Sequence, residues 1–164
     1  MKSAIRIITC DERAATAYDA WLVWPSRIHV EKRGELRSAW EDFHEHGRPS
    51  ALGRGPSANA AQHFASEHRE PLELARRFAR DVVAWLDREH APHAAEGELP
   101  VFAAPRFLGQ LRNAAGAGRN RFELLRGEFH ALSAAQLAQE PAIEALVRRR
   151  ASAPRGTAAA SGAD

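Results

Sequence analysis

Cysteine is nearly absent from this chain of 164 residues, and long hydrophobic runs are missing altogether. A single thiol cannot close an internal disulfide, so the expected role of Cys10 is that of a small buried side chain. The apolar start of the chain is interrupted by Arg6 and Asp11, which leaves it too short for a signal peptide or a membrane span. These absences predict a cytoplasmic protein without a membrane-spanning segment.

The common catalytic and metal-binding patterns are missing as well. None of the eight histidines lies in a His-Glu-x-x-His pattern, and no serine lies in a Gly-x-Ser-x-Gly pattern. The chain is therefore expected to hold no metal ion or cofactor and not to be an enzyme. A minor alternative remains, a metal-dependent phosphodiester hydrolase that uses Asp11 at the end of the first apolar segment.

The composition is that of one folded domain with a polar end. With 45% hydrophobic residues, a chain of this length can bury one ordinary core, which we place in residues 3–150. From Ala151 onward the sequence is mostly Ala, Ser, Gly, Pro and Thr. Such a segment buries too little apolar surface to offset the entropy of ordering, so residues 151–164 are predicted to be a disordered tail.

Positive charge is concentrated in the last third of the folded part. The net charge is only +2, but residues 101–150 contain eight arginines against four glutamates. Five of these arginines lie within about twenty residues of one another: Arg106, Arg112, Arg119, Arg121 and Arg126. Such a group can attract phosphates or an acidic partner, although an ordinary solvated surface has the same composition.

The first quarter of the chain predicts an antiparallel meander. Apolar, β-branched and aromatic side chains predict four strand segments, at residues 5–10, 15–24, 28–32 and 36–43. Arg33 and Gly34 are expected to form a tight turn between the last two. Residues 20–32 could also form one long bent strand, so the meander has either three or four strands.

The remainder alternates between helices and strands. A long loop is expected over residues 44–70, followed by an amphipathic helix that starts at Pro71. Residues 99–103 and 122–125 predict strands on either side of a helix that begins at Pro105, and Ser133 starts a final helix with a capping box. This order predicts a single α/β domain with a mixed sheet, a meander first and then helix, strand, helix, strand, helix.

The helix after Pro105 carries the candidate binding residues. Arg106, Gln110 and Asn113 lie at i, i+4 and i+7, which gives a polar stripe opposite the apolar side chains of that helix. Arg106 falls in the first turn after a strand, where the start of a helix attracts anions. This position suits a phosphate of RNA or of a nucleotide, although any amphipathic surface helix shows a similar stripe.

The run Ala104–Arg112, the strand before it and the spacing to Leu132-Ser133 resemble the bacterial host attachment protein family. That family is similar in turn to bacterial relatives of the archaeo-eukaryotic class 1 release factors, which implies a ribonuclease H-like mixed sheet. The family's central loop corresponds to residues 48–56, which include Arg54, and its histidine-containing segment to residues 63–70, which begin with His63. The release factors' Gly-Gly-Gln loop is absent, so peptidyl-tRNA hydrolysis by that route is not expected.

Two functions follow as hypotheses. The first is a non-catalytic RNA- or ribosome-associated module that binds through its basic face. Its candidate binding residues are Arg106, Gln110, Arg112, Asn113, Arg121, Arg54 and His63. The alternative is a protein–protein or host-surface attachment factor without affinity for nucleic acid.

Overall fold

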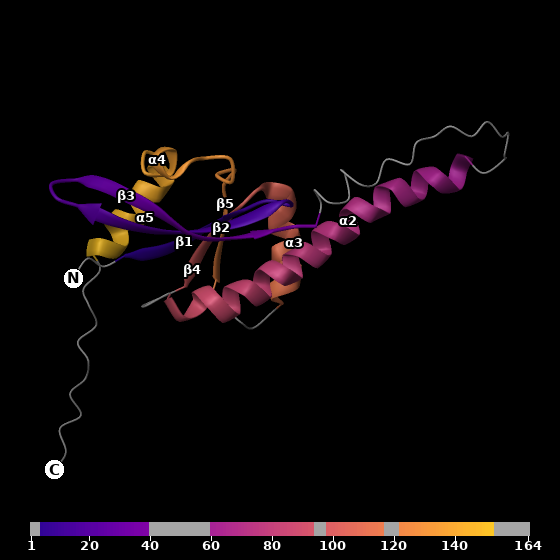
Figure 1. Cartoon of the computed structure of the whole chain (residues 1–164), viewed down its shortest axis with the longest axis horizontal. Helices are drawn as coiled ribbons and strands as arrows, with labels where there is room; N and C mark the ends of the chain where they lie inside the picture. Colours follow the sequence, from indigo (N-terminus) through magenta and orange to yellow (C-terminus); the bar gives the residue numbers. More distant parts are fainter. Residues whose placement is uncertain (1–3, 40–59, 94–97, 117–121, 153–164) are drawn as a thin grey trace, which may run out of the picture.

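The computed structural model describes residues 4–39, 60–93, 98–116 and 122–152. Within these ranges a five-stranded sheet has the order β3-β2-β1-β4-β5 (Figure 1). The strands are β1 (Ile5–Cys10), β2 (Ala14–Val23), β3 (Arg27–Arg37), β4 (Leu99–Ala103) and β5 (Phe122–Arg126). The first three pair antiparallel, whereas β4 pairs parallel to β1 and β5 parallel to β4. The predicted fold class, a single α/β domain with a ribonuclease H-like mixed sheet, is confirmed.

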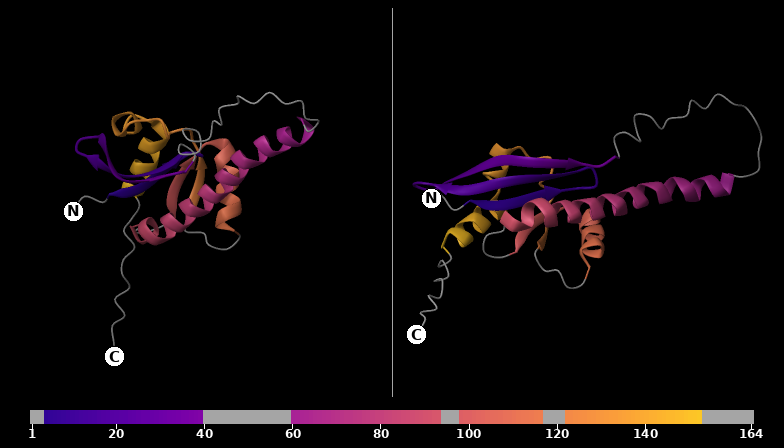
Figure 2. Two further views of the ribbon diagram at one scale, coloured as in Figure 1. Left: turned by 45° about the vertical axis from the view of Figure 1, so that its right-hand side comes forward. Right: turned by 60° about the horizontal axis from the view of Figure 1, so that its bottom comes forward.

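One face of the sheet is covered by two amphipathic helices, α2 (Ala60–Trp85) and α3 (Pro105–Ala115), which lie side by side (Figure 2). Alternate residues of β1 and β4, among them Ile8 and Val101, are fully buried beneath them. Phe78 of α2 stacks on Phe107 of α3 with ring centroids 5.7 Å apart. This layer positions the start of α3 at the end of β4.

The opposite face carries α4 (Ala134–Leu137) and α5 (Pro141–Ser152). Their buried side chains, which include Leu137 and Ile143, pack on Ile7 and Phe102 of the sheet. Because successive side chains of a strand point to opposite faces, the strands contribute to two separate apolar clusters, one on each face of the sheet. None of the described helices is long and apolar enough to cross a membrane.

Three helix boundaries follow the local signals of the sequence. Pro105 occupies the first turn of α3, and Gly116 ends that helix with a φ of 68°. Ser133 and Gln136 form the predicted capping box: the Gln136 amide donates to Ser133 Oγ at 3.3 Å, and the Ser133 amide donates to Gln136 Oε1 at 2.9 Å.

Two helix predictions are wrong. The long central helix starts at Ala60 rather than at Pro71, so the last part of the expected loop is helical and Pro71 lies inside α2. Residues 60–70 are rich in good helix formers, and a proline costs a helix one backbone donor that its other hydrogen bonds can outweigh. The final helix is divided into α4 and α5, because Pro141 has no amide hydrogen with which to continue α4.

The turn predicted at Arg33-Gly34 is also wrong. Both residues lie inside β3, which forms one continuous strand, so the described part of the meander has three strands. The register shifts here: Ala17 pairs with Gly34 and Tyr18 with Lys32, which leaves Arg33 as an extra residue. Arg33 and Gly34, which suggested a chain reversal, therefore lie at a β-bulge instead of a turn.

Candidate functional site

A cleft of about 330 Å³ opens where the parallel strands end. It lies at the carboxyl ends of β1 and β4, beside the start of α3 and the segment that follows β5. This edge is where α/β sheets generally bind ligands, because successive connections there leave a crevice. The cleft is lined by Asp11, Glu12, Arg13, Ala104, Pro105, Arg106, Glu128 and His130.

Asp11 organises one wall of this cleft. Its Oδ1 accepts hydrogen bonds from the backbone amides of Arg13, at 2.8 Å, and Ala14, at 2.9 Å. These bonds close the turn from β1 to β2, a local role typical of aspartate at a strand end. Its Oδ2 lies 3.3 Å from Nε2 of His130, which comes from the segment after β5. One carboxylate therefore fixes a turn and holds a histidine from a distant part of the chain.

The start of α3 forms the second wall. Ala104 is held by a 3.2 Å hydrogen bond from its amide to the carbonyl of Cys10, and it has no side chain that could cap the helix. The amides of Arg106 and Phe107 precede the first helical hydrogen bond, which runs from Leu108 back to Ala104 at 2.9 Å. The positive end of the helix therefore faces the cleft without a side-chain acceptor.

Arg106 lines the cleft with an exposed side chain. It forms no ion pair with any residue in the described ranges. Further along α3, Gln110 is half-buried and Asn113 is exposed, while Phe107, Leu108 and Leu111 are buried. The predicted separation of a polar stripe from an apolar side is confirmed. Of the stripe only Arg106 reaches the cleft, and a binding role for its three members stays a prediction.

Two further exposed arginines lie on α3 and β5. Arg112 is exposed on α3, and Arg126 is exposed at the last position of β5, where it pairs with Ala103 of β4. No described carboxylate forms an ion pair with either of them. We call Arg106, Arg112 and Arg126 the basic face.

The carboxylate of β5 does not oppose these arginines. Glu123 lies 3.8 Å from Arg149 and 3.7 Å from Arg150 of α5, on the other side of the sheet. The partners of Glu123 therefore lie on α5, whereas Glu128 lines the cleft together with Arg106.

The structure does not describe the side chains of the remaining predicted site residues. Arg54 and Arg121 lie outside the described residues, and His63 belongs to α2 but its side chain is not among those described. Conversely, the prediction of binding residues omitted Asp11, Arg13 and His130. Because each of the first two follows a strand end in sequence, the carboxyl-edge rule could have found them. His130 needs the three-dimensional fold, since 119 positions separate it from Asp11.

The acidic groups and the histidine do not form a metal centre by geometry. Among the described residues, no three histidine, cysteine or carboxylate side chains come close enough together to hold one ion. Asp11 is engaged with two amides and His130, and Glu128 is exposed. The cleft brings two arginines, Arg13 and Arg106, and the start of α3 together with three carboxylates, those of Asp11, Glu12 and Glu128.

The fold and this cleft define the class: a three-layer α/β domain with a ribonuclease H-like sheet and polar groups at the sheet's carboxyl edge. The family model described as "Protein required for attachment to host cells" matches residues 8–140, from within β1 to the residue before α5. The chain therefore belongs to the host attachment protein family. No curated protein matches it.

Proposed function

We propose that this member of the host attachment family is a non-catalytic module that binds RNA, free or in the ribosome, through its basic face. The observation that carries the proposal is the group of three exposed arginines, Arg106, Arg112 and Arg126, on the neighbouring elements α3 and β5. None of them is paired with a described carboxylate. One of them stands at the start of α3 in the cleft.

Uncompensated arginines suit a phosphate backbone. Neighbouring guanidinium groups repel one another unless an anion lies between them, and the planar guanidinium binds phosphate oxygens through two parallel hydrogen bonds. The helix start adds backbone amides that are directed at the same anion. Binding of this kind depends little on base sequence and weakens steeply with salt, because each neutralised phosphate releases counterions.

The resemblance to relatives of the release factors supports a ribosomal setting. It does not supply a hydrolytic group, because Gly109 and Gln110 lie within α3 instead of on a free loop. The function proposed is therefore binding without peptidyl-tRNA hydrolysis.

The test is a titration of the purified full chain against labelled tRNA and ribosomal subunits at low and at physiological salt. We expect binding that weakens by roughly tenfold or more over this range and in an Arg106→Glu/Arg112→Glu double variant. Arg27→Glu, at the opposite edge of the sheet, is the matched control and should bind normally. Absence of binding at either salt would refute the proposal, and Mg²⁺-dependent cleavage lost in Asp11→Ala would refute its non-catalytic part.

A second candidate, a direct attachment factor, is favoured by the family description itself. It is tested by incubating labelled protein with host cells and with the same RNA ligands. Cell binding that survives Arg106→Glu/Arg112→Glu, together with no affinity for RNA, would replace the first proposal by this one.

A further inference from the structure

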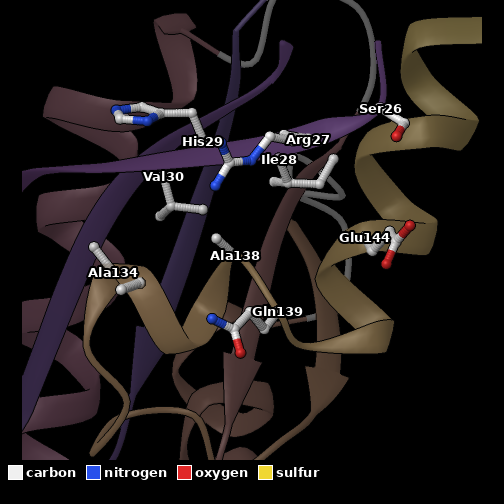
Figure 3. A pocket seen from close by; sticks show the side chains of 10 residues that line it. Ser26, Arg27, Ile28, His29, Val30, Ala134, Ala138, Gln139 and Glu144 are labelled. Atoms are coloured by element: carbon white, nitrogen blue, oxygen red, sulfur yellow. The ribbon is translucent and has the colours of Figure 1, made fainter. Parts of the chain in front are cut away.

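A second and larger hollow, of about 740 Å³, lies beneath the outer strand β3. Figure 3 shows Ile28 and Val30 of β3 opposite Ala134 and Ala138, with Glu144 of α5 at the end near Ser26. The facing residues, Ala134 of α4 and Ala138 just after it, are small; they pack with Ile28 against the apolar cluster that contains Val30, and the hollow lies beside them. We call this hollow the β3 groove.

The strand above the β3 groove has an open edge. β3 is the last strand of the sheet on this side, and it pairs only with β2. In the described structure, no backbone hydrogen bond joins residues 27–30 to any segment other than β2. Outward-facing amides and carbonyls of such an edge are a template on which another extended chain can pair.

The charge around the β3 groove is positive. Arg27 is exposed, and it forms no ion pair with any described residue. The acidic group of the groove, Glu144, is neutralised by Arg148, whose Nε donates to it at 2.7 Å. Arg148 also donates from Nη2 to the Ser26 carbonyl at 3.0 Å, which keeps its guanidinium at the same end.

An exposed apolar patch adjoins this end of β3. Trp24 is 90% exposed and Leu22 36% exposed, and both precede Ser26 in the β2–β3 hairpin. Tryptophan is one of the residues enriched in the hot spots of protein interfaces. The patch, the open edge and the positive charge therefore meet along one short stretch of chain.

We propose that the β3 groove binds an extended acidic peptide segment of a partner protein, which adds to β3 as a further strand. Backbone pairing along residues 27–30 supplies affinity, alternate apolar side chains enter over the alanines of α4, and carboxylates pair with Arg27. A second copy of this chain fits less well. Two β3 strands paired antiparallel about His29 would place Arg27 opposite Glu31, but Glu31 already forms an ion pair with Arg33 at 3.1 Å.

The charge of the ligand is tested with two blocked eight-residue probes, alternating Glu-Val and alternating Lys-Val, titrated into the full chain and followed by backbone amide NMR shifts. We expect the Glu-Val probe to shift amides of residues 26–30 and to bind at least fivefold more weakly to Arg27→Glu. Arg112→Glu, on the basic face, should leave binding unchanged. Equal binding of the Lys-Val probe, no binding of the Glu-Val probe, or full binding by Arg27→Glu would overturn the proposal.

The strand geometry is tested with two N-methylated versions of the Glu-Val probe. One version carries N-methyl groups on its odd residues and the other on its even residues, so that charge and side chains are the same. Strand addition predicts that one version loses binding and the other keeps it, because only alternate amides face β3. Equal binding by both, or dimerisation of the protein in sedimentation that competes with the probe, would contradict it.

Discussion

At Gly127 the chain passes too close to two aromatic rings to carry a side chain. A Cβ atom there would lie 2.8 Å from Cε2 of Phe129 and 3.1 Å from Cδ1 of Phe102. The same residue donates its amide to the Ala103 carbonyl at 3.0 Å, which continues the pairing of β4 and β5 by one residue. The backbone can therefore move away from the rings only by weakening this bond.

We expect Gly127→Ala to lower the free energy of unfolding by about 1–3 kcal/mol, the usual cost of overfilling a packed site. Gly109→Ala is the matched control, because a Cβ at this helical position meets no atom within 4 Å. In that variant the free energy of unfolding should rise by about 0.5–1 kcal/mol, because alanine loses less backbone entropy in a helix than glycine does. Urea denaturation measures both, and equal effects of the two substitutions would contradict the packing described around Gly127.

Asp19 joins three parts of the molecule through its two carboxylate oxygens. Arg6 of β1 donates to Oδ1 at 2.5 Å, and Arg33 at the bulge of β3 donates to Oδ2 at 2.7 Å. Arg6 also donates to Nδ1 of the buried His90 at 2.7 Å. Burial raises the pKa of Asp19, but the hydrogen bonds and charges of Arg6 and Arg33 lower it by more, so this pKa lies below its ordinary value.

A carboxylate with a lowered pKa stabilises the fold at neutral pH, and its contribution is lost as the pH falls through the folded-state pKa. We therefore expect Asp19→Asn to destabilise the protein most near pH 7. The penalty should shrink below about pH 4, where an unfolded aspartate begins to protonate. Denaturant titrations at both pH values measure it. As a control, Glu73→Gln breaks an exposed ion pair with Arg76 and should have almost no effect on stability. An equal penalty of Asp19→Asn at both pH values would contradict the ion pairs described for Asp19.

Among the helices, the four-residue α4 depends on its cap more than the longer ones do. A helix this short has little internal hydrogen bonding, so the cap formed by Ser133 and Gln136 and the packing of Leu137 hold it in place. Ser133→Ala is expected to cost about 1 kcal/mol. The control Ser26→Ala removes an exposed hydroxyl with no described hydrogen bond, and it should cost little. Thermal or urea unfolding compares them, and equal stability of the two variants would argue against the cap.

The sequence predicts a helix boundary well where a residue at that boundary determines it. Pro105, Gly116 and Ser133 each act within one helical turn, so their helix boundaries follow from the residue type alone. Gly34 and Pro71 led to wrong predictions because their effect on the backbone depends on the strand and the residues around them. Pairing with β2 keeps β3 continuous through a bulge, and favourable residues on both sides carry α2 through its proline. The candidate site was predicted only in part for a similar reason, because Asp11 and His130 meet through the fold.

On the scale of the whole molecule, the two proposed surfaces lie at opposite edges of one sheet. The basic face belongs to α3 and β5, and the β3 groove belongs to the strand at the other edge. The two surfaces share no residue, so a charge reversal at one edge should leave the other intact. Arg27→Glu and Arg112→Glu therefore serve as controls for each other.

The measurement that tests the central proposal most directly is the salt dependence of RNA affinity in the full chain and in an Arg106→Gln/Arg112→Gln/Arg126→Gln variant. Each phosphate contact with single-stranded RNA contributes about 0.7 to the slope of log affinity against log salt. If the basic face binds the backbone, the variant should lose about 2 from that slope. A slope that stays the same in the variant would show that these three arginines do not contact RNA.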